Sequence, residues 1–431
     1  MIKKQHFSMV IWIAALLISC NAFLDVEPKD RYLQASVFAS ADETELARKG
    51  IYTKLASDAL YGGALTMGAL DVMAQYYKNE PDHVMFGFIQ YDYKDPYVAT
   101  TFERTWETAY NTLLNINSFI AGVKNEQSVL DAHVRQRYLG EAYGLRAYIH
   151  FDLLRLFGPV YSENPDGDAI PYVLTPSVHV PSLLSAKEVG QRVLADLDSA
   201  FACLSAVGGM QEIKPSRFNK TAALALHARV SLYLGNQTEA AYYAQRALEE
   251  RKDKIIFALP IPDMQQQYER YFSPTQESSI LLWPATSALL ATYSWNSDDL
   301  RFQSNWAFYP AGRERIAVFS KYAPPSKEVS LLRTTELYFI LAECATDTQM
   351  AESYLQQVGQ LYGELELPGN SISDKLLLAY RREFWGEGQL FYFYKRNSVD
   401  VIPYASIFDG TRQIFPEDYQ VPVPESELIY R

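Results

Sequence analysis

The sequence predicts a mostly α-helical fold in which helices follow one another in pairs and long irregular loops interrupt them. Apolar residues recur at helical spacing through most of the 431 residues. One stretch, residues 222–248, joins two such helices through a Gly235-Asn236 turn. Hydrophobic residues make up 48% of the chain, which is enough to bury a sizeable core.

The chain begins with features of a secretory leader. Lys3 and Lys4 precede the apolar run 9–18, and about ten apolar residues are too few to span a ~30 Å hydrocarbon core. The run ends in Leu17-Ile18-Ser19-Cys20, which resembles the lipobox of bacterial lipoproteins. We therefore expect residues 1–19 to be a signal peptide and Cys20 to become the first residue, carrying acyl chains such as palmitate.

The predicted helices follow in order. Residues 40–58 form the first, with Asp42 near its cap, and residues 99–123 form the second. Residues 132–156 form the third, which stops at Phe157-Gly158-Pro159 because glycine and proline end helices. Further helical patterns cover residues 186–204, 216–234, 237–250, 328–346, 348–361 and 373–391.

Residues 222–248 carry the clearest helix pair. Its first helix presents Ala223 and Val230, and its second presents Ala240 and Ala244. Small residues let two antiparallel helices approach closely, as in a tetratricopeptide repeat. The other pairs are degenerate, so periodicity alone predicts only a helical chain with some helix–turn–helix repeats.

Three stretches break the helical pattern. Residues 60–98 are rich in Gly, Tyr and Phe, and residues 158–185 contain five prolines. Residues 255–327 mix short apolar runs with aromatic residues, among them Trp283, Tyr293, Trp295, Trp306, Phe308 and Tyr309. Long loops inside a compact domain are costly to order, so we expect the regions 60–98 and 255–327 to be variable loops with a function.

Charge excludes several partners. Removal of Lys3 and Lys4 with the signal peptide leaves 37 basic and 51 acidic residues, a net charge of −14. Such a surface does not suit nucleic acid, which needs a basic footprint. It also does not suit anionic headgroups, so we expect a lipid anchor, not surface charge, to hold the protein at a membrane.

Sequence motifs of catalysis and metal binding are missing. The chain has no His-Glu-x-x-His, Gly-x-Ser-x-Gly or Walker sequence, and no spacing suggests the two facing carboxylates of a glycosidase. The histidines after residue 19, none paired at metal-ligand spacing, are His83, His133, His150, His179 and His227. We therefore expect no enzyme activity, no metal and no cofactor. Cys203 and Cys344 are expected to be buried free thiols, although one disulfide is arithmetically possible.

Six segments in order resemble the SusD/RagB family of outer-membrane lipoproteins of Bacteroidetes. They are Cys20 with Phe23-Leu24-Asp25 and Pro28, Trp106–Asn117, Glu141–Pro159, Leu332–Ala345, Arg381–Arg396 and Val421–Glu427. Two positions depart from the family pattern, since Gln389 replaces an arginine and Tyr394 replaces a leucine. The chain is also short for the family, which implies trimmed ligand-facing loops and leaves the ligand open.

The resemblance implies a single α-helical domain over residues 20–431, built on four tetratricopeptide-like helix pairs with long irregular ligand-binding loops. It also implies a surface-exposed lipoprotein of the outer membrane that caps a SusC-like TonB-dependent transporter. We expect it to capture an oligosaccharide and pass it to that transporter. A peptide ligand, or a transporter lid with no strong ligand affinity of its own, are the alternatives.

Ligand contacts are expected in the two variable regions. A sugar presents an apolar C–H face, which an aromatic ring can cover, and a rim of hydroxyls, which polar side chains can bind. The candidates with this chemistry are Asp71, Tyr76, Tyr77, Asn79, Tyr293, Trp295, Asn296, Asp298, Arg301 and Trp306. For any single aromatic residue among them, packing in the core is the alternative.

The charged residues of the shared segments are expected to be structural. A buried arginine needs a carboxylate partner, and its bidentate fork makes it a good fastener between helices. The expected pairs are Arg146 with Glu141, Arg333 with Glu336, and Arg381 with Glu387.

Overall fold

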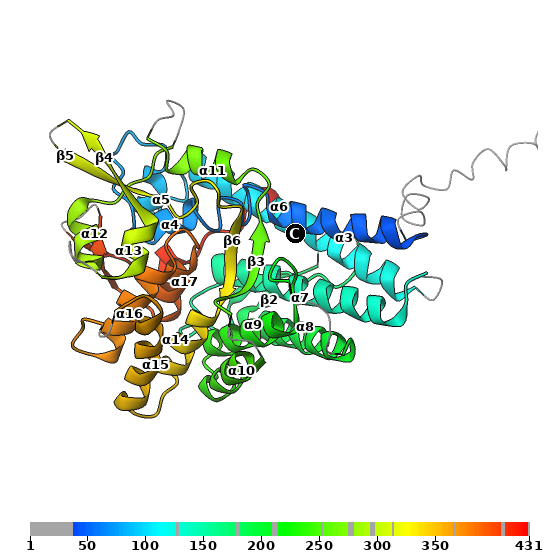
Figure 1. Ribbon diagram of the computed structural model, residues 1–431. Helices are drawn as coiled ribbons and strands as arrows, with labels where there is room; N and C mark the ends of the chain where they lie inside the picture. The colour runs from blue at the N-terminus through cyan, green and yellow to red at the C-terminus, as the bar shows by residue number, and fades with distance from the viewer. Residues whose placement is uncertain are drawn as a thin grey trace, which may run out of the picture.

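The computed structural model describes residues 38–125, 129–177, 181–208, 214–250, 253–274, 280–293, 298–312, 314–364, 367–406 and 410–429. The described chain is mostly helical, as the sequence predicts (Figure 1). The predicted signal peptide and Cys20 lie outside these residues. Within the part described, no helix combines the length and the hydropathy needed to cross a membrane.

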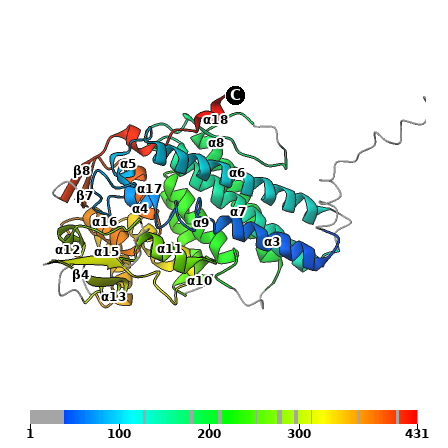
Figure 2. The same ribbon diagram turned by 90° about the horizontal axis from the view of Figure 1, so that it is seen from above.

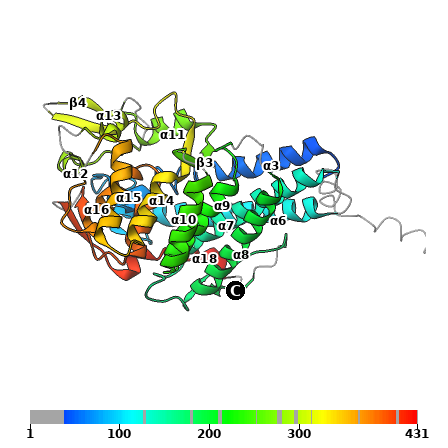
Figure 3. The same cartoon turned by 60° about the horizontal axis from the view of Figure 1, so that its bottom comes forward.

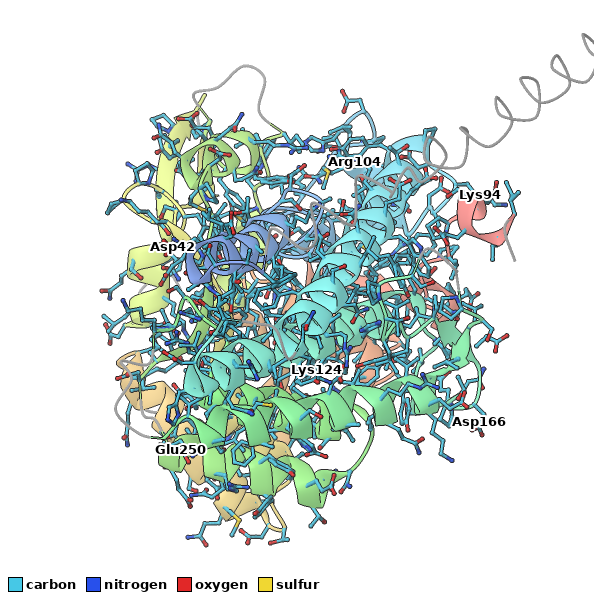
Figure 4. All side chains as sticks on the ribbon, turned by 90° about the vertical axis from the view of Figure 1, so that its right-hand side faces the viewer. Asp42, Lys94, Arg104, Lys124, Asp166 and Glu250 are labelled. Carbon is cyan, nitrogen blue, oxygen red and sulfur yellow. The ribbon has the colours of Figure 1, made fainter. Side chains whose placement is uncertain are left out.

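Three long helices run side by side at one end of the molecule, α3 (Ala41–Leu55), α6 (Pro96–Lys124) and α7 (Ala132–Phe157) (Figure 2). The side chain of Asp95 begins α6 by accepting hydrogen bonds from two N–H groups of the first turn. Figure 4 shows the outer side of this end, where Arg104 and Lys124 mark the course of α6. Helix α7 ends at Gly158, as predicted.

The remaining long helices form a stack that begins with α8 (Ala186–Ala206) packed on α7. The others are α9 (Lys220–Tyr233), α10 (Gln237–Glu250), α14 (Thr334–Glu343), α15 (Thr348–Leu361), α16 (Ile372–Glu383) and α17 (Gln389–Arg396). Helix α9 packs on α10, α10 on α14, and α14 on α15 (Figure 3). Between α9 and α10, Ala240, Ala244 and Ala247 are fully buried, and Gly235 makes the turn with φ +79°. The helix pair predicted at 222–248 is therefore confirmed.

Short antiparallel strand pairs join these helices, and the sequence did not predict them. They are β1 (Asp168–Ile170) with β2 (Leu184–Ser185), β3 (Ile255–Pro260) with β6 (Glu328–Arg333), β4 (Trp306–Ala311) with β5 (Glu314–Phe319), and β7 (Val401–Ala405) with β8 (Gly410–Gln413). The predicted helix 328–346 is wrong over residues 328–333, which form β6. Because β6 is buried on both faces, it lacks the alternation that distinguishes a strand from a helix.

The single helix predicted over residues 373–391 is also wrong, because the chain turns between α16 and α17. Gly386 and Gly388 have φ of +78° and +67° there. A Cβ on Gly388 would lie 2.2 Å from the carbonyl oxygen of Leu65, so only glycine fits at this position. A close approach between distant segments thus decides this break.

The two variable regions contain short helices within their loops. These are α4 (Ala69–Met73), α5 (Phe86–Gln90), α11 (Met264–Tyr271), α12 (Thr286–Thr292) and α13 (Leu300–Asn305). With β4 and β5 they gather at the end of the molecule away from the start of α3 (Figure 1). The chain closes with a 3₁₀ turn (Pro416–Tyr419) and α18 (Glu425–Leu428).

Cys203 and Cys344 are both free, so the disulfide alternative is excluded. They are half-buried, not fully buried as expected. Burial raises the pKa of the Cys344 thiol to about 11, which keeps it protonated at neutral pH.

Candidate ligand-binding surface

The two variable regions predicted from the sequence lie against each other. The backbone N–H of Lys78 donates to the carbonyl of Trp283 at 2.8 Å, and Nε2 of His83 lies 2.8 Å from the carbonyl oxygen of Ile280. The ring of Tyr77 packs 6.3 Å from that of Phe272. We call the area where residues 58–98 meet residues 263–309 the loop surface.

An ion pair with aromatic neighbours lies on the loop surface. Arg270 of α11 bonds to Asp58 at 2.8 Å, and both side chains are partly exposed. The Tyr271 hydroxyl donates to Asp58 at 3.3 Å, and the Arg270 guanidinium lies 3.5 Å from the Tyr97 hydroxyl. Burial works against the charge of Arg270, but Tyr271 and Asp58 outweigh it and raise its pKa. Arg270 is thus a permanent donor at this surface.

Other aromatic side chains of the loop surface are not fully covered. Trp283, Tyr97 and Tyr309 are half-buried. The hydroxyls of Tyr268, on α11, and Tyr309, on β4, are within hydrogen-bonding reach of each other. Partly exposed aromatic rings on the same surface as a charged donor and acceptor have the chemistry that the apolar face and hydroxyl rim of a sugar require.

Asn79 is the most informative of the predicted site residues. Its side chain is 2% exposed, yet neither its amide nitrogen nor its amide oxygen has a hydrogen-bond partner among the residues described. Trp306 also keeps an unpartnered ring nitrogen while being 7% exposed. A buried polar group without a partner is costly, and such groups are uncommon in folded proteins. The protein itself covers these atoms, and ligand contact by Asn79 and Trp306 stays a prediction.

Asp71, Tyr76 and Tyr77 lie in the core beneath the loop surface. The Tyr76 ring stacks 4.0 Å from that of Trp385, and the Tyr77 hydroxyl accepts from the Trp385 ring nitrogen at 3.0 Å. The Asp71 carboxylate accepts from the N–H groups of Gly386 and Gly388 at 2.5 and 3.0 Å. Their packing roles are established by these contacts, whereas ligand contact by them stays a prediction.

The pKa of Asp71 shows how deeply this support is buried. Burial raises the pKa of its carboxyl to about 8, against the opposing effect of the two glycine N–H groups and the Tyr77 hydroxyl. Asp71 therefore binds the turn between α16 and α17 from a site that water does not reach.

The predicted site residues of the second variable region, from Tyr293 to Arg301, lie in three kinds of environment. Tyr293 is buried and donates to the carbonyl of Arg382 at 3.1 Å, and Arg301 is buried against Asp299 and Glu383. Asp298 is exposed. Trp295 and Asn296 lie outside the described residues, so the prediction for them is unchanged.

A buried ionic network ties the loop region to the helical stack. Glu383 bonds to Arg301 at 2.9 Å and to Arg333 at 2.7 Å, while Glu387 pairs with Arg333 and Lys321. Burial disfavours the charge on Glu383, yet the two arginines hold its pKa well below its usual value. Burial, with help from Arg333, lowers the pKa of Lys321 to about 8 despite its partner Glu387. The network positions the strand β6 and the turn at Gly386.

The predicted arginine fasteners are buried, but their partners differ from those expected. Arg146 pairs with Asp196 at 2.6 Å, Glu141 pairs with Arg217, Glu336 pairs with Arg229 at 2.5 Å, and Arg333 pairs with Glu383 and Glu387. Arg381 donates to the Thr292 hydroxyl and to the carbonyl of Tyr404. Glu141 and Arg146 are five residues apart and point about 140° apart around α7, so each pairs with a residue of a neighbouring segment.

The sequence interpretation missed Asp58, Tyr97, Arg270 and Trp283. Tyr97 and Trp283 fall inside or at the edge of the predicted variable regions, so their aromatic character was the available signal. Asp58 and Arg270 lie far apart in the chain, and no local pattern pairs them. Among the residues described, no cluster of three or more His, Cys, Asp or Glu side chains could hold a metal ion.

Comparison with known proteins gives a consistent result. Residues 22–232 match the SusD-like family described as "Starch-binding associating with outer membrane". A SusD-like protein of Formosa agariphila is 27% identical over 57% of this chain and 45% of its own length. A SusD-like protein of Bacteroides ovatus is 24% identical over 47% of this chain and 35% of its own length. Both matches thus span less than half of the relative's length.

Solved structures resemble nearly the whole chain. A putative sugar binding protein of Bacteroides vulgatus has a TM-score of 0.74 at 19% identity, over 90% of this chain and 96% of its own. A SusD-like carbohydrate binding protein of the same species has a TM-score of 0.74 at 16% identity, over 91% and 97%. A SusD superfamily protein of Bacteroides thetaiotaomicron has a TM-score of 0.73 at 19% identity, over 90% and 97%. These likenesses concern the fold.

Proposed function

Because this chain belongs to the SusD/RagB family, we propose that it is a cell-surface lipoprotein that captures an oligosaccharide and passes it to a SusC-like TonB-dependent transporter. The family description names starch binding at the outer membrane, and two similar structures are described as sugar or carbohydrate binding proteins. These descriptions favour a carbohydrate over a peptide.

The unpartnered amide of Asn79 carries the proposal for the ligand site. It lies directly after Lys78, whose N–H bonds to the backbone of Trp283. An amide that can both donate and accept suits a sugar hydroxyl, and the half-buried indole of Trp283 suits a sugar face. Arg270 and Asp58 add a donor and an acceptor on the same surface.

A binding screen tests the proposal. The protein without its signal peptide is titrated against a library of neutral and acidic oligosaccharides and, in parallel, a library of peptides. Trp283→Ala should weaken oligosaccharide binding at least roughly tenfold, because the ring covers one sugar face. Tyr242→Ala, which removes an exposed aromatic ring of α10, is the matched control and should bind as the wild type does. Binding of peptides alone would overturn the carbohydrate assignment.

The anchor and the transporter are tested separately. Cys20→Ala should release a folded protein from the membrane, and this protein should still bind ligand. The reason is that several acyl chains on Cys20, at ~0.8 kcal/mol per buried CH₂, anchor the protein. Purification of the lipidated protein from outer membranes should recover a SusC-like TonB-dependent transporter with it. A Cys20→Ala protein that stays in the membrane fraction would contradict the anchor.

A further inference from the structure

A groove of about 740 Å³ lies at the turns of the helical stack, and it shares no lining residue with the loop surface. Its walls come from the α9–α10 turn, the α14–α15 turn, the start of α16, the end of α17 and the loop at Tyr161. The volume falls within the ~300–1,000 Å³ of typical small-ligand sites.

Neutral hydroxyl and amide groups dominate the rim of this groove. The polar uncharged side chains on it are Ser162, Gln237, Thr346, Thr348, Ser373 and Asn397. Two of its charged side chains neutralise each other, since Arg396 pairs with Glu343 at 2.8 Å. Half-buried Tyr161 forms one wall, with its ring 5.8 Å from that of Tyr233. The groove therefore offers an aromatic face and many neutral hydrogen-bonding groups.

A small cavity of about 30 Å³ lies directly beneath, because it shares Leu232, Tyr233, Phe393 and Arg396 with the groove. The Tyr233 hydroxyl has no hydrogen-bond partner within the described chain, although the residue is only 4% exposed. The Tyr392 hydroxyl, which lines the same cavity, is likewise unpartnered there. Two buried hydroxyls without partners at one cavity are unusual, because a protein core normally satisfies its polar groups. Tyr233, which carries one of them, also lines the groove.

We infer that this groove is a second binding site for a short neutral oligosaccharide, with Tyr161 against a sugar face and the Tyr233 hydroxyl bonded to a sugar hydroxyl. This inference rests on the proposed function for the class of ligand and goes beyond it in placing a site on the helical stack.

The electrostatics of the groove select against anionic ligands. The N-terminus of α15 is capped by the Asp347 carboxylate, and that of α16 is capped by Ser371 and Asp374. These caps occupy helix N–H groups that would otherwise attract an anion, and they add negative charge. A cationic ligand would have to compete with Arg396 for Glu343. A neutral polyhydroxylated ligand does not meet the obstacle to anions.

Two substitutions separate binding from folding. Tyr233→Phe removes only an unpartnered hydroxyl, so it should leave the melting temperature unchanged or slightly higher. It should weaken binding in the groove roughly two- to tenfold, the range for one neutral hydrogen bond. Tyr110→Phe is the matched control, because the Tyr110 hydroxyl bonds to the carbonyl of Pro171 at 2.9 Å, far from the groove in sequence. It should not change binding. Tyr161→Ala should weaken binding roughly tenfold.

The probes are maltohexaose, cellohexaose, xylohexaose and mannohexaose, and the readouts are calorimetry and hydrogen–deuterium exchange. At least one probe should protect the backbone around residues 232–237 and 342–348, and this protection should persist in Trp283→Ala. Protection of the loop surface alone, or groove protection unchanged by Tyr233→Phe and Tyr161→Ala, would overturn the second site while leaving the proposed function intact. Absence of protection by any probe at both places would count against both.

Discussion

Replacement of Asn79 by leucine should make the protein more stable and a worse binder. The Asn79 amide is 2% exposed and has no hydrogen-bond partner within the described chain. An unsatisfied buried polar group costs ~1–3 kcal/mol, and an apolar side chain of similar shape removes that cost. We therefore expect Asn79→Leu to raise the free energy of unfolding of the ligand-free protein by ~1–2 kcal/mol.

The expected thermal shift is small because the chain is long. An entropy of unfolding of ~2.1 cal/mol/K per residue gives about 0.9 kcal/mol/K for 431 residues, so the melting temperature should rise by ~1–2 °C. Oligosaccharide affinity should fall at the same time. Two neutral hydrogen bonds are worth ~1–3 kcal/mol together, which corresponds to roughly 5- to 150-fold in the dissociation constant.

Calorimetric titration and urea unfolding measure the two effects on the same preparations. Asn117→Leu is the matched control, because the Asn117 amide donates to the carbonyl of Val173 at 3.1 Å and accepts from Arg146 at 2.9 Å. The control should lose ~1–3 kcal/mol of stability and keep its ligand affinity. A lower melting temperature for Asn79→Leu would mean that the amide is satisfied within the protein. An unchanged affinity would refute its role in binding.

Three further predictions concern the scaffold. Arg229→Met should cost ~3–5 kcal/mol by leaving Glu336 buried and unpaired, and adding Glu336→Leu should restore most of it in urea unfolding. Gly388→Ala should destabilise by ~2 kcal/mol or more through its positive φ and its close approach to the neighbouring backbone, whereas Gly50→Ala, in an open helix position, should stabilise by ~0.5–1 kcal/mol. Burial lowers the pKa of His150 to about 3, so the unfolded state binds more protons than the folded state, and the free energy of unfolding should fall as the pH drops from about 6.5 toward 3. Between pH 6 and 4, the free energy of unfolding of His150→Gln should therefore change by ~1.4 kcal/mol less per pH unit than that of the wild-type protein.

Helix positions were predictable because the pattern that produces them is local. The periodicity of residues 99–123 and 132–156 corresponds to α6 and α7, and the small residues around Gly235 correspond to the α9–α10 pair. Prediction failed where distant segments meet. Residues 328–333 became a strand by pairing with β3, and the helix predicted over 373–391 breaks where Leu65 approaches Gly388.

The two variable regions were predictable as breaks in the helical pattern, but the packing of their individual residues was not. The composition of 60–98 and 255–327 indicated functional loops, and these segments do lie together. Sequence composition treats Tyr76, Tyr77 and Asn79 alike. In the folded chain Trp385 stacks on Tyr76 and bonds to Tyr77, while the amide of Asn79 is left without a partner.

The sequence by itself determined the helical class, the resemblance to a family and the two regions expected to bind, because periodicity, motifs and composition are properties of neighbouring residues. The tertiary structure alone decided which charges pair and which polar atoms stay unsatisfied. Arg146 pairs with Asp196 on α8, and Glu141 pairs with Arg217, although the expected partners Arg146 and Glu141 both lie on α7. Partners are chosen by the packing of elements distant in the chain, and hydrogen-bond satisfaction is known only once every neighbour is in place.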